Sequence, residues 1–326
     1  MSLTLVRNEV AGVVADLQPA SSTRGMTTTK RTKIRMKQRI AENFSRAADS
    51  YDQAAILQKR VAARTIPRLP THLKPKLKSK QPDSEGMQAH YRILDLGTGT
   101  GLHSLTLAKR YDNAIVIGMD LAMGMLQFAK KNINHPRISW CSGDIESIPF
   151  KSNTVDLIYS SLAIQWCSFE KVLCEVNRVL KFDGTFVFST LAEGSLKELS
   201  SAWSLAGEKD RVNHFDSFKT QKQCLNDSDL VQQAFSLRPE TLFYPDVITL
   251  LRNLKSLGVN TVLADKCGLL TRRKLETLGQ AYERIRQPEG LPLTYQVIYG
   301  VFQKPHRPIV TDSAQAKISV TRCNNA

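Results

Sequence analysis

The chain has 326 residues, of which 42% are hydrophobic and 7% aromatic, with 45 Lys and Arg against 30 Asp and Glu. This length and apolar content suffice for a sizeable buried core and exclude a disordered or collagen-like polymer. No run of eighteen apolar residues occurs, so we expect no membrane-spanning helix. The six cysteines form no CxxC pair, which argues against a structural zinc site or a disulfide framework. We therefore expect a cytoplasmic protein with reduced thiols and no bound metal.

The net charge of +15 would suit a nucleic-acid-binding protein, so its position along the chain matters. Thirteen of these charges fall within residues 1–40, residues 67–92 and the tail from Lys304. The excess therefore lies in expected flanks and a linker, and we expect neither nucleic acid nor a membrane as partner. The expected segments are a flexible basic extension (1–36), a basic linker (67–90) and a flexible tail (305–326).

Apolar residues recur every three or four positions from Ile34 to Ile66, which is helical spacing. We expect two helices there, broken near residues 49–52, and we expect residues 37–66 to cover a site. Beyond the linker, short apolar runs alternate with amphipathic stretches. The predicted strands are 91–96, 114–119, 138–141, 155–160, 185–190, 241–244 and 295–302. The predicted helices are 102–110, 123–132, 169–180, 195–206, 227–235, 246–257 and 271–285.

Alternation of strands and helices at this interval predicts βαβ units and a parallel sheet with both faces covered. The first predicted strand is followed by Gly97, Gly99 and Gly101, which open a helix. Neither a dinucleotide fingerprint nor a phosphate-binding loop ending in Gly-Lys-Ser/Thr fits this spacing. The preceding Asp95 would repel a pyrophosphate but suits a ligand that carries an ammonium and a sulfonium. This arrangement is typical of S-adenosylmethionine-dependent methyltransferases.

Polar residues also follow the next three predicted strands. Asp120 ends the second strand, where an acid can accept both hydroxyls of a ribose. Asp144 follows the third strand, well placed for an adenine amine, with Ile145 beside the ring. The fourth strand ends at Ser160 and Ser161, where the chain should pass under the reacting methyl group. Each acid alone would be interpreted as a helix N-cap, but together with the glycines they favour a cofactor site. We therefore expect S-adenosyl-L-methionine as cofactor, bound by Gln58, Asp95, Gly97, Gly99, Gly101, Asp120, Met125, Asp144, Ile145 and Ser161.

Several longer segments resemble the BioC family, the malonyl-acyl-carrier-protein O-methyltransferases of biotin synthesis. They are residues 44–58, 143–149, 161–167, 189–199, 254–258, 270–272 and 291–295, within a similarity that runs from about 38 to 304. The resemblance implies an α/β fold with a seven-stranded Rossmann-like class I methyltransferase sheet over residues 91–304. It also implies N-terminal helices over the site and a helical lid at about 246–286. Departures are the 1–36 extension, a Lys-rich insert at 71–88, and Thr98 and Thr100, where relatives usually carry Cys and Pro.

The resemblance implies methylation of the free carboxylate of a malonyl thioester on acyl carrier protein or coenzyme A. Because a carboxylate is ionised at neutral pH, the displacement needs orientation and desolvation but no general base. Two catalytic residues are hypothesised: Tyr51 caps the cofactor and orients the acceptor, and Arg252 clamps the carboxylate. The structural alternatives are core packing for Tyr51 and a solvated helix face for Arg252. Trp166 is interpreted first as a core residue and second as a substrate wall.

The expected partner is an acidic acyl carrier protein bearing malonyl-phosphopantetheine, and a monomer is expected. Its docking face is predicted at Lys266, Arg272, Arg273 and Lys274. Two other functions stay open at this point. One is a methyltransferase for a different small molecule, such as a quinone. The other is a methyltransferase-fold assembly factor that acts on a protein partner, as in the complex I assembly factors that the chain also resembles.

Overall fold

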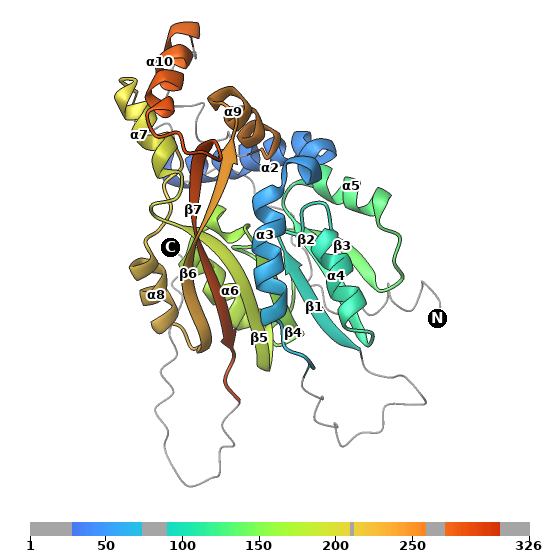
Figure 1. Ribbon diagram of the computed structural model, residues 1–326. Helices are drawn as coiled ribbons and strands as arrows, with labels where there is room; N and C mark the ends of the chain where they lie inside the picture. Colours follow the sequence, from blue (N-terminus) through green and yellow to red (C-terminus); the bar gives the residue numbers. More distant parts are fainter. Residues whose placement is uncertain (1–27, 74–89, 209–211, 259–270, 307–326) are drawn as a thin grey trace, which may run out of the picture.

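The computed structural model describes residues 28–73, 90–208, 212–258 and 271–306, and it has an α/β fold (Figure 1). One seven-stranded sheet organises these residues, in the order β3-β2-β1-β4-β5-β7-β6. The strands are β1 (Tyr91–Leu96), β2 (Ala114–Asp120), β3 (Ile138–Ser142), β4 (Val155–Ser161), β5 (Leu180–Ala192), β6 (Val231–Tyr244) and β7 (Leu291–Gln303). The seven-stranded sheet predicted from the sequence is confirmed.

Strand direction changes at one strand of the sheet. Neighbours from β3 to β5 pair in parallel, as the alternating sequence pattern predicted, whereas β7 runs antiparallel between β5 and β6. The parallel arrangement predicted from the sequence was therefore wrong for β7 alone, because β6 runs in the same direction as β5. The chain order reverses between β1 and β4, and ligands bind at the carboxyl ends of the strands at such a switch point.

The described helices surround this sheet and extend beyond one end of it (Figure 1). They are α2 (Thr28–Ala54), α3 (Ile56–Thr65), α4 (Leu102–Arg110), α5 (Met123–Asn132), α6 (Phe169–Val179), α7 (Lys197–Leu205), α8 (Phe218–Asn226), α9 (Val247–Ser256) and α10 (Arg272–Glu283), with 3-10 turns η1 (Ile66–Arg68) and η2 (Ile164–Trp166). The predicted break between the first two helices falls at Ala55, a few residues later than expected. Residues 28–36 of the expected extension are helical.

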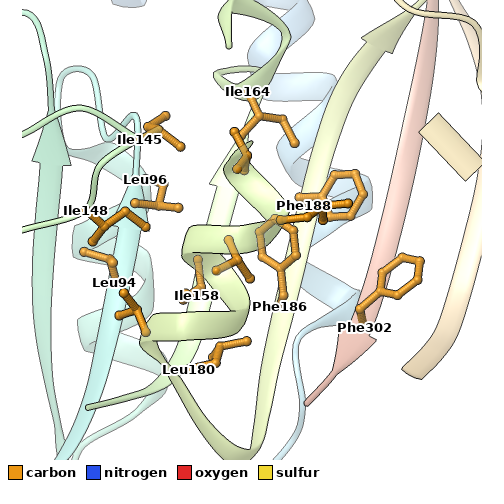
Figure 2. Packing of buried hydrophobic residues seen from close by; sticks show 14 of the residues in the cluster. Leu94, Leu96, Ile145, Ile148, Ile158, Ile164, Leu180, Phe186, Phe188 and Phe302 are labelled. Atoms are coloured by element: carbon orange, nitrogen blue, oxygen red, sulfur yellow. The ribbon is translucent and has the colours of Figure 1, made fainter. Parts of the chain in front are cut away.

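The two faces of the sheet bury separate apolar clusters. On one face Leu94, Ile117 and Ile158 pack beneath α6 together with a row of phenylalanines. The rings of Phe186 and Phe188 stack with their centroids 4.7 Å apart, and Figure 2 shows them beside Leu180 and Ile158. On the other face, side chains of β1, β2 and α4 form the second cluster. Burial on both faces explains why the parallel strands are nearly continuous apolar runs.

One predicted helix, at residues 227–235, was wrong. In the structure α8 ends at Asn226, and β6 begins at Val231 and pairs along its length with β7. β6 is an edge strand whose first half is largely exposed, so its sequence lacks the apolar alternation that indicates a strand. Pairing with a distant strand decided the conformation there. The predicted strand at 241–244 is the end of β6, and the other predicted strands and helices are confirmed within a few residues.

The two predicted lid helices are α9 and α10, which lie with α7 beyond one end of the sheet (Figure 1). Several expectations fall outside the described residues: most of the 1–36 extension, the Lys-rich insert, Lys266 and most of the tail. Within the described residues, no helix combines the length and apolarity that a membrane crossing requires.

Candidate functional site

The glycine loop after β1 turns twice through backbone conformations that favour glycine. Gly97 and Gly99 have φ of 71° and 55°. A Cβ at Gly97 would overlap Ala163 in the turn after β4, whereas a Cβ at Gly99 would meet no protein atom within 4 Å. Gly97 therefore permits close packing, and Gly99 leaves room for a ligand. Gly101 packs against Trp140 and does not line the site.

A cleft lies between this loop, the ends of β2 and β4, and α2. Its walls include eight residues that the sequence analysis singled out: Tyr51, Gly97, Gly99, Asp120, Met125, Asp144, Ile145 and Ser161. Eight further residues also line it: Lys37, Ile40, Phe44, Leu121, Leu162, Ala163, Trp166 and Cys167.

Asp120 is held rigidly at the end of β2. Its Oδ2 accepts a hydrogen bond from the Gly99 amide at 2.9 Å, and its Oδ1 accepts one from the Ala122 amide at 2.8 Å. Burial raises the pKa of this carboxyl group, while the two backbone amides oppose the shift. A fixed carboxylate facing the cleft can accept hydrogen bonds from paired hydroxyl groups.

Asp95 lies beneath the glycine loop, outside the walls of the cleft. Its side chain is 1% exposed, and its Oδ2 accepts hydrogen bonds from Thr98 Oγ1 at 2.9 Å and Ser104 Oγ at 2.7 Å. Burial raises the pKa of Asp95 to about 6, although both hydroxyls oppose that shift. The structure therefore places Asp95 where it supports the loop, and not where it would touch a ligand. Thr98, a departure from the usual family pattern, is part of that support.

The Asp144 carboxylate is bound by a lysine of α2, the helix that covers the cleft. Lys37 Nζ, on α2, donates to its two oxygens at 2.6 and 2.8 Å and also lies 3.1 Å from Glu146 Oε2. Burial disfavours the ammonium, but the two carboxylates raise the pKa of Lys37 on balance. This group of charges joins α2 to the turn after β3 and closes that end of the cleft.

A smaller cavity continues the cleft along the glycine loop, between α2, α3 and α4. Tyr51, Asp52 and Gln58 form one side of it, and Thr100 donates to Asp52 Oδ1 at 2.7 Å. His103, on the other side, has its pKa lowered to about 4 by burial, so its imidazole is neutral at pH 7. Burial and the charge of Asp120 raise the pKa of Tyr51, against a hydrogen bond from Gln58. The Tyr51 hydroxyl therefore stays protonated and can donate.

A third cavity, which we call the acceptor chamber, adjoins the cleft on its lid side. Tyr51, Phe44, Leu162 and Trp166 line both spaces. Trp166 meets Phe44 edge-on, with the ring centroids 5.8 Å apart, so it forms a cavity wall as well as packing. The rest of the chamber is mainly apolar and includes Leu57, Leu191, Leu196, Leu254, Leu257 and Tyr295.

The structure does not bring Arg252 to this site. Arg252 is exposed on α9, outside the walls of the three cavities, and its charge acts on Asp246 at the start of the helix. Its role as a carboxylate clamp stays a prediction. On α10, Arg272 is paired with Glu276 at 3.0 Å and Lys274 with Glu208, while Arg273 is exposed.

Three wall residues of α2, Lys37, Ile40 and Phe44, were missed although a signal for them existed. Lys37, Phe44 and Tyr51 recur at intervals of seven along α2, and Ile40 lies on the same helix face, which covers the cleft. Because Tyr51 was already assigned, the same periodicity pointed to the others. Asp52 was quoted in a family segment without a role, and no local pattern distinguishes it.

The chain is similar in sequence to known methyltransferases. Residues 94–188 match the family model described as "Methyltransferase domain". The malonyl-[acyl-carrier protein] O-methyltransferase of Gallionella capsiferriformans is 34% identical over 292 residues, which cover 85% of this chain and 94% of that relative. The chain belongs to the malonyl-[acyl-carrier protein] O-methyltransferase family. The resemblance found in the sequence is thereby confirmed, as are the methyltransferase class and the fold.

One relative of this methyltransferase is a longer, bifunctional protein. The biotin biosynthesis bifunctional protein BioHC of Cellvibrio japonicus is 37% identical over 272 residues, covering 82% of this chain but 50% of that protein. Among solved structures, the YcgJ protein of Bacillus subtilis is 18% identical, with a TM-score of 0.47, covering 68% of this chain and 94% of that one.

The cofactor of this methyltransferase is S-adenosylmethionine, and the residues of the cleft fit it. Gly99 leaves open space at the loop, Asp120 offers a rigid acceptor for ribose hydroxyls, and Met125 and Ile145 provide apolar walls. The adenine amine expected at Asp144 would share that carboxylate with Lys37.

Proposed function

We propose that this chain transfers the methyl group of S-adenosylmethionine to the free carboxylate of a malonyl thioester on acyl carrier protein, giving the malonyl methyl ester. Relatives that match most of the chain are named for this activity. The structural observation that carries the proposal is the shared wall between the cleft and the acceptor chamber. A donor in the first space and an acceptor in the second would meet at Tyr51.

The cleft residues would hold the cofactor in one orientation. Asp120 would accept the ribose hydroxyls, Ile145 and Asp144 would hold the adenine, and Asp52 would balance the ammonium group in the smaller cavity. When bound, the cofactor supplies an electrophilic methyl group on a positively charged sulfur. Ser161 and Leu162, at the end of β4, would lie beneath that methyl group.

The chemistry at the shared wall needs no proton transfer. A lone pair of the malonyl carboxylate would form the O–CH3 bond as the bond between that methyl group and the cofactor sulfur breaks, and the products would be a neutral ester and a neutral thioether. Tyr51 would donate a hydrogen bond to the carboxylate, since Gln58 interacts with its hydroxyl and its raised pKa keeps the proton in place. Phe44, Leu162 and Trp166 would exclude water from the nucleophile, so that orientation and desolvation supply the rate enhancement.

The carrier would dock at the outer side of the lid. Leu254 of α9 and Leu257, just after the helix, form part of the chamber wall, while Arg252 and Lys255 of α9 are exposed. An acidic carrier attracted to these cations, and to Arg273 on α10, would bring its prosthetic group to the chamber. The cytoplasmic location and the monomeric state expected from the sequence stay predictions.

Complementation tests this function in a cell. The gene for this chain, placed in a biotin auxotroph that lacks its own malonyl-carrier methyltransferase, should restore growth without biotin. A Gly99→Val variant, in which the side chain fills the open space at the loop, should not restore growth at equal protein level. If the parent chain is present as folded protein and does not restore growth without biotin, the proposal is contradicted.

A further inference from the structure

Two glutamines in the wall of the acceptor chamber each keep an oxygen without a hydrogen-bond partner in the described structure. Gln58 Oε1 and Gln165 Oε1 are both buried, and both side chains line the chamber. A buried carbonyl oxygen left without a donor has lost its hydrogen bonds to water without compensation. Such oxygens on side chains of a cavity wall are suited to a ligand with N–H or O–H groups.

The orientation of the Gln165 side chain is fixed by its other end. Its Nε2 donates to the carbonyl oxygen of Leu162 at 2.6 Å, so the amide nitrogen is committed and Oε1 is the acceptor that is left over. Leu162 and Leu196, both in the chamber wall, have φ of 51° and 60°, a conformation that bulky residues rarely adopt. Backbone strain of this kind concentrates at ligand-binding sites.

The two glutamines differ in position. Gln58 also lines the smaller cavity at the glycine loop and interacts with Tyr51, so it belongs to the methyl-transfer site. Gln165 lines the acceptor chamber and neither of the other two cavities. A part of the acceptor beside Gln165 would therefore lie away from the reacting carboxylate.

We infer that Gln165 Oε1 accepts a hydrogen bond from the first amide N–H of the acceptor's phosphopantetheine arm. An ionised malonyl group has no N–H or O–H, and a thioester has none either. Along the unit S–CH2–CH2–NH–CO, the amide nitrogen is the first donor, and the methylenes before it suit the apolar walls. The inference rests on the proposed function and adds the feature by which the enzyme recognises its acyl arm, which the carrier and coenzyme A share.

A single-atom change in the substrate tests this assignment. Malonyl-pantetheine would be compared with an analogue in which an ester oxygen replaces the first amide N–H, so that only the donor is lost. The parent enzyme should show a kcat/KM about tenfold higher for the amide, as expected for an unpaired buried acceptor. In Gln165→Leu the two substrates should react equally well.

The ratio between the two substrates separates recognition from damage to the fold. Loss of the Gln165–Leu162 hydrogen bond would slow the reaction of both substrates alike and leave the ratio of their kcat/KM values unchanged. The control variant is Gln53→Leu, at an exposed position of α2, which should keep the full preference for the amide substrate. A parent enzyme without the preference, or a Gln165→Leu enzyme that retains it, would overturn the inference. If no malonyl thioester is methylated at all, the proposed function itself fails.

Acyl carrier protein and coenzyme A both carry the phosphopantetheine arm, which allows a further comparison. Gln165→Leu should lower kcat/KM for malonyl-carrier and for malonyl-coenzyme A by the same factor, because the amide is common to both. A loss restricted to one of them would assign Gln165 to the carrier or to the nucleotide, and the inference would be wrong.

Discussion

Tyr51 is the residue on which the chemistry of the site depends most directly. Tyr51 lines both the cleft and the acceptor chamber, and its raised pKa makes its hydroxyl a hydrogen-bond donor and not a base. A hydrogen bond to a charged group contributes about 1.5–3 kcal/mol. Tyr51→Phe should therefore lower kcat about 10- to 100-fold with little change in the Kd for S-adenosylmethionine.

Steady-state kinetics and calorimetry on the same preparation check this expectation. Tyr91→Phe, at the start of β1, is the matched control and should behave like the parent. A Tyr51→Phe enzyme with unchanged kcat on malonyl-carrier would show that Tyr51 serves only packing.

Gly99 offers a second test, with a control inside the same chain. Gly99 and Gly207 both have positive φ, and a Cβ at either would meet no protein atom within 4 Å, but only the former lines the cleft. Alanine at each position should cost a similar ~1–2 kcal/mol in the free energy of unfolding. We expect Gly99→Ala alone to weaken S-adenosylmethionine binding, by about tenfold in Kd. Equal Kd values for the two variants would mean that the open space at Gly99 does not receive the cofactor.

Among the elements, α2 and α9 enclose the site from the side away from the sheet. α2 is tied to the sheet by the Lys37–Asp144 ion pair and to α9 by a hydrogen bond from Asn253 Nδ2 to the Ala54 carbonyl at 3.2 Å. The outer surface of α9 carries the cations to which the carrier would dock.

Removing those cations should affect the carrier and spare the small substrate. The double variant Arg252→Ala and Lys255→Ala should raise KM for malonyl-carrier several-fold at low salt, and this difference should shrink as ionic strength rises. KM for malonyl-pantetheine should not change. The same measurement on Lys130→Ala with Lys131→Ala, exposed on α5, is the control. A rise in KM for both substrates would instead support the original assignment of Arg252 to the malonyl carboxylate.

Elements with a local signal were predicted well, whereas those set by distant contacts were not. β1, β2 and β4 are buried on both faces and are visible as apolar runs, and the glycine loop carries its own motif. β6 depends on its pairing with β7, and its exposed half has no strand pattern. Likewise, polar residues at the strand ends indicated where the cofactor would bind. The chamber includes residues from α2, α3, η2 and α9, and no short motif predicts that these elements come together.

For the whole molecule, the buried Asp95 links stability to pH. Burial raises its pKa to about 6 in the folded chain, above the ordinary value of 3.8. The folded state therefore holds this proton more tightly than the unfolded state, and stability from this group is lost as pH rises from about 4 to 6. The free energy of unfolding of the parent, relative to Asp95→Asn, should fall over that range by up to about 3 kcal/mol. Denaturant titrations at several pH values check this, and parallel curves for the two proteins would contradict it.

The described part of the chain combines a cofactor cleft at the switch point of the sheet with an acceptor chamber under the lid. The most direct measurement is mass spectrometry of acyl carrier protein after incubation with the purified chain and S-adenosylmethionine. Malonyl-carrier should gain one methyl group, removable by an esterase, while acetyl-carrier, which lacks the free carboxylate, should gain none. Unmodified malonyl-carrier, from a protein that binds S-adenosylmethionine in the same solution, would contradict the account.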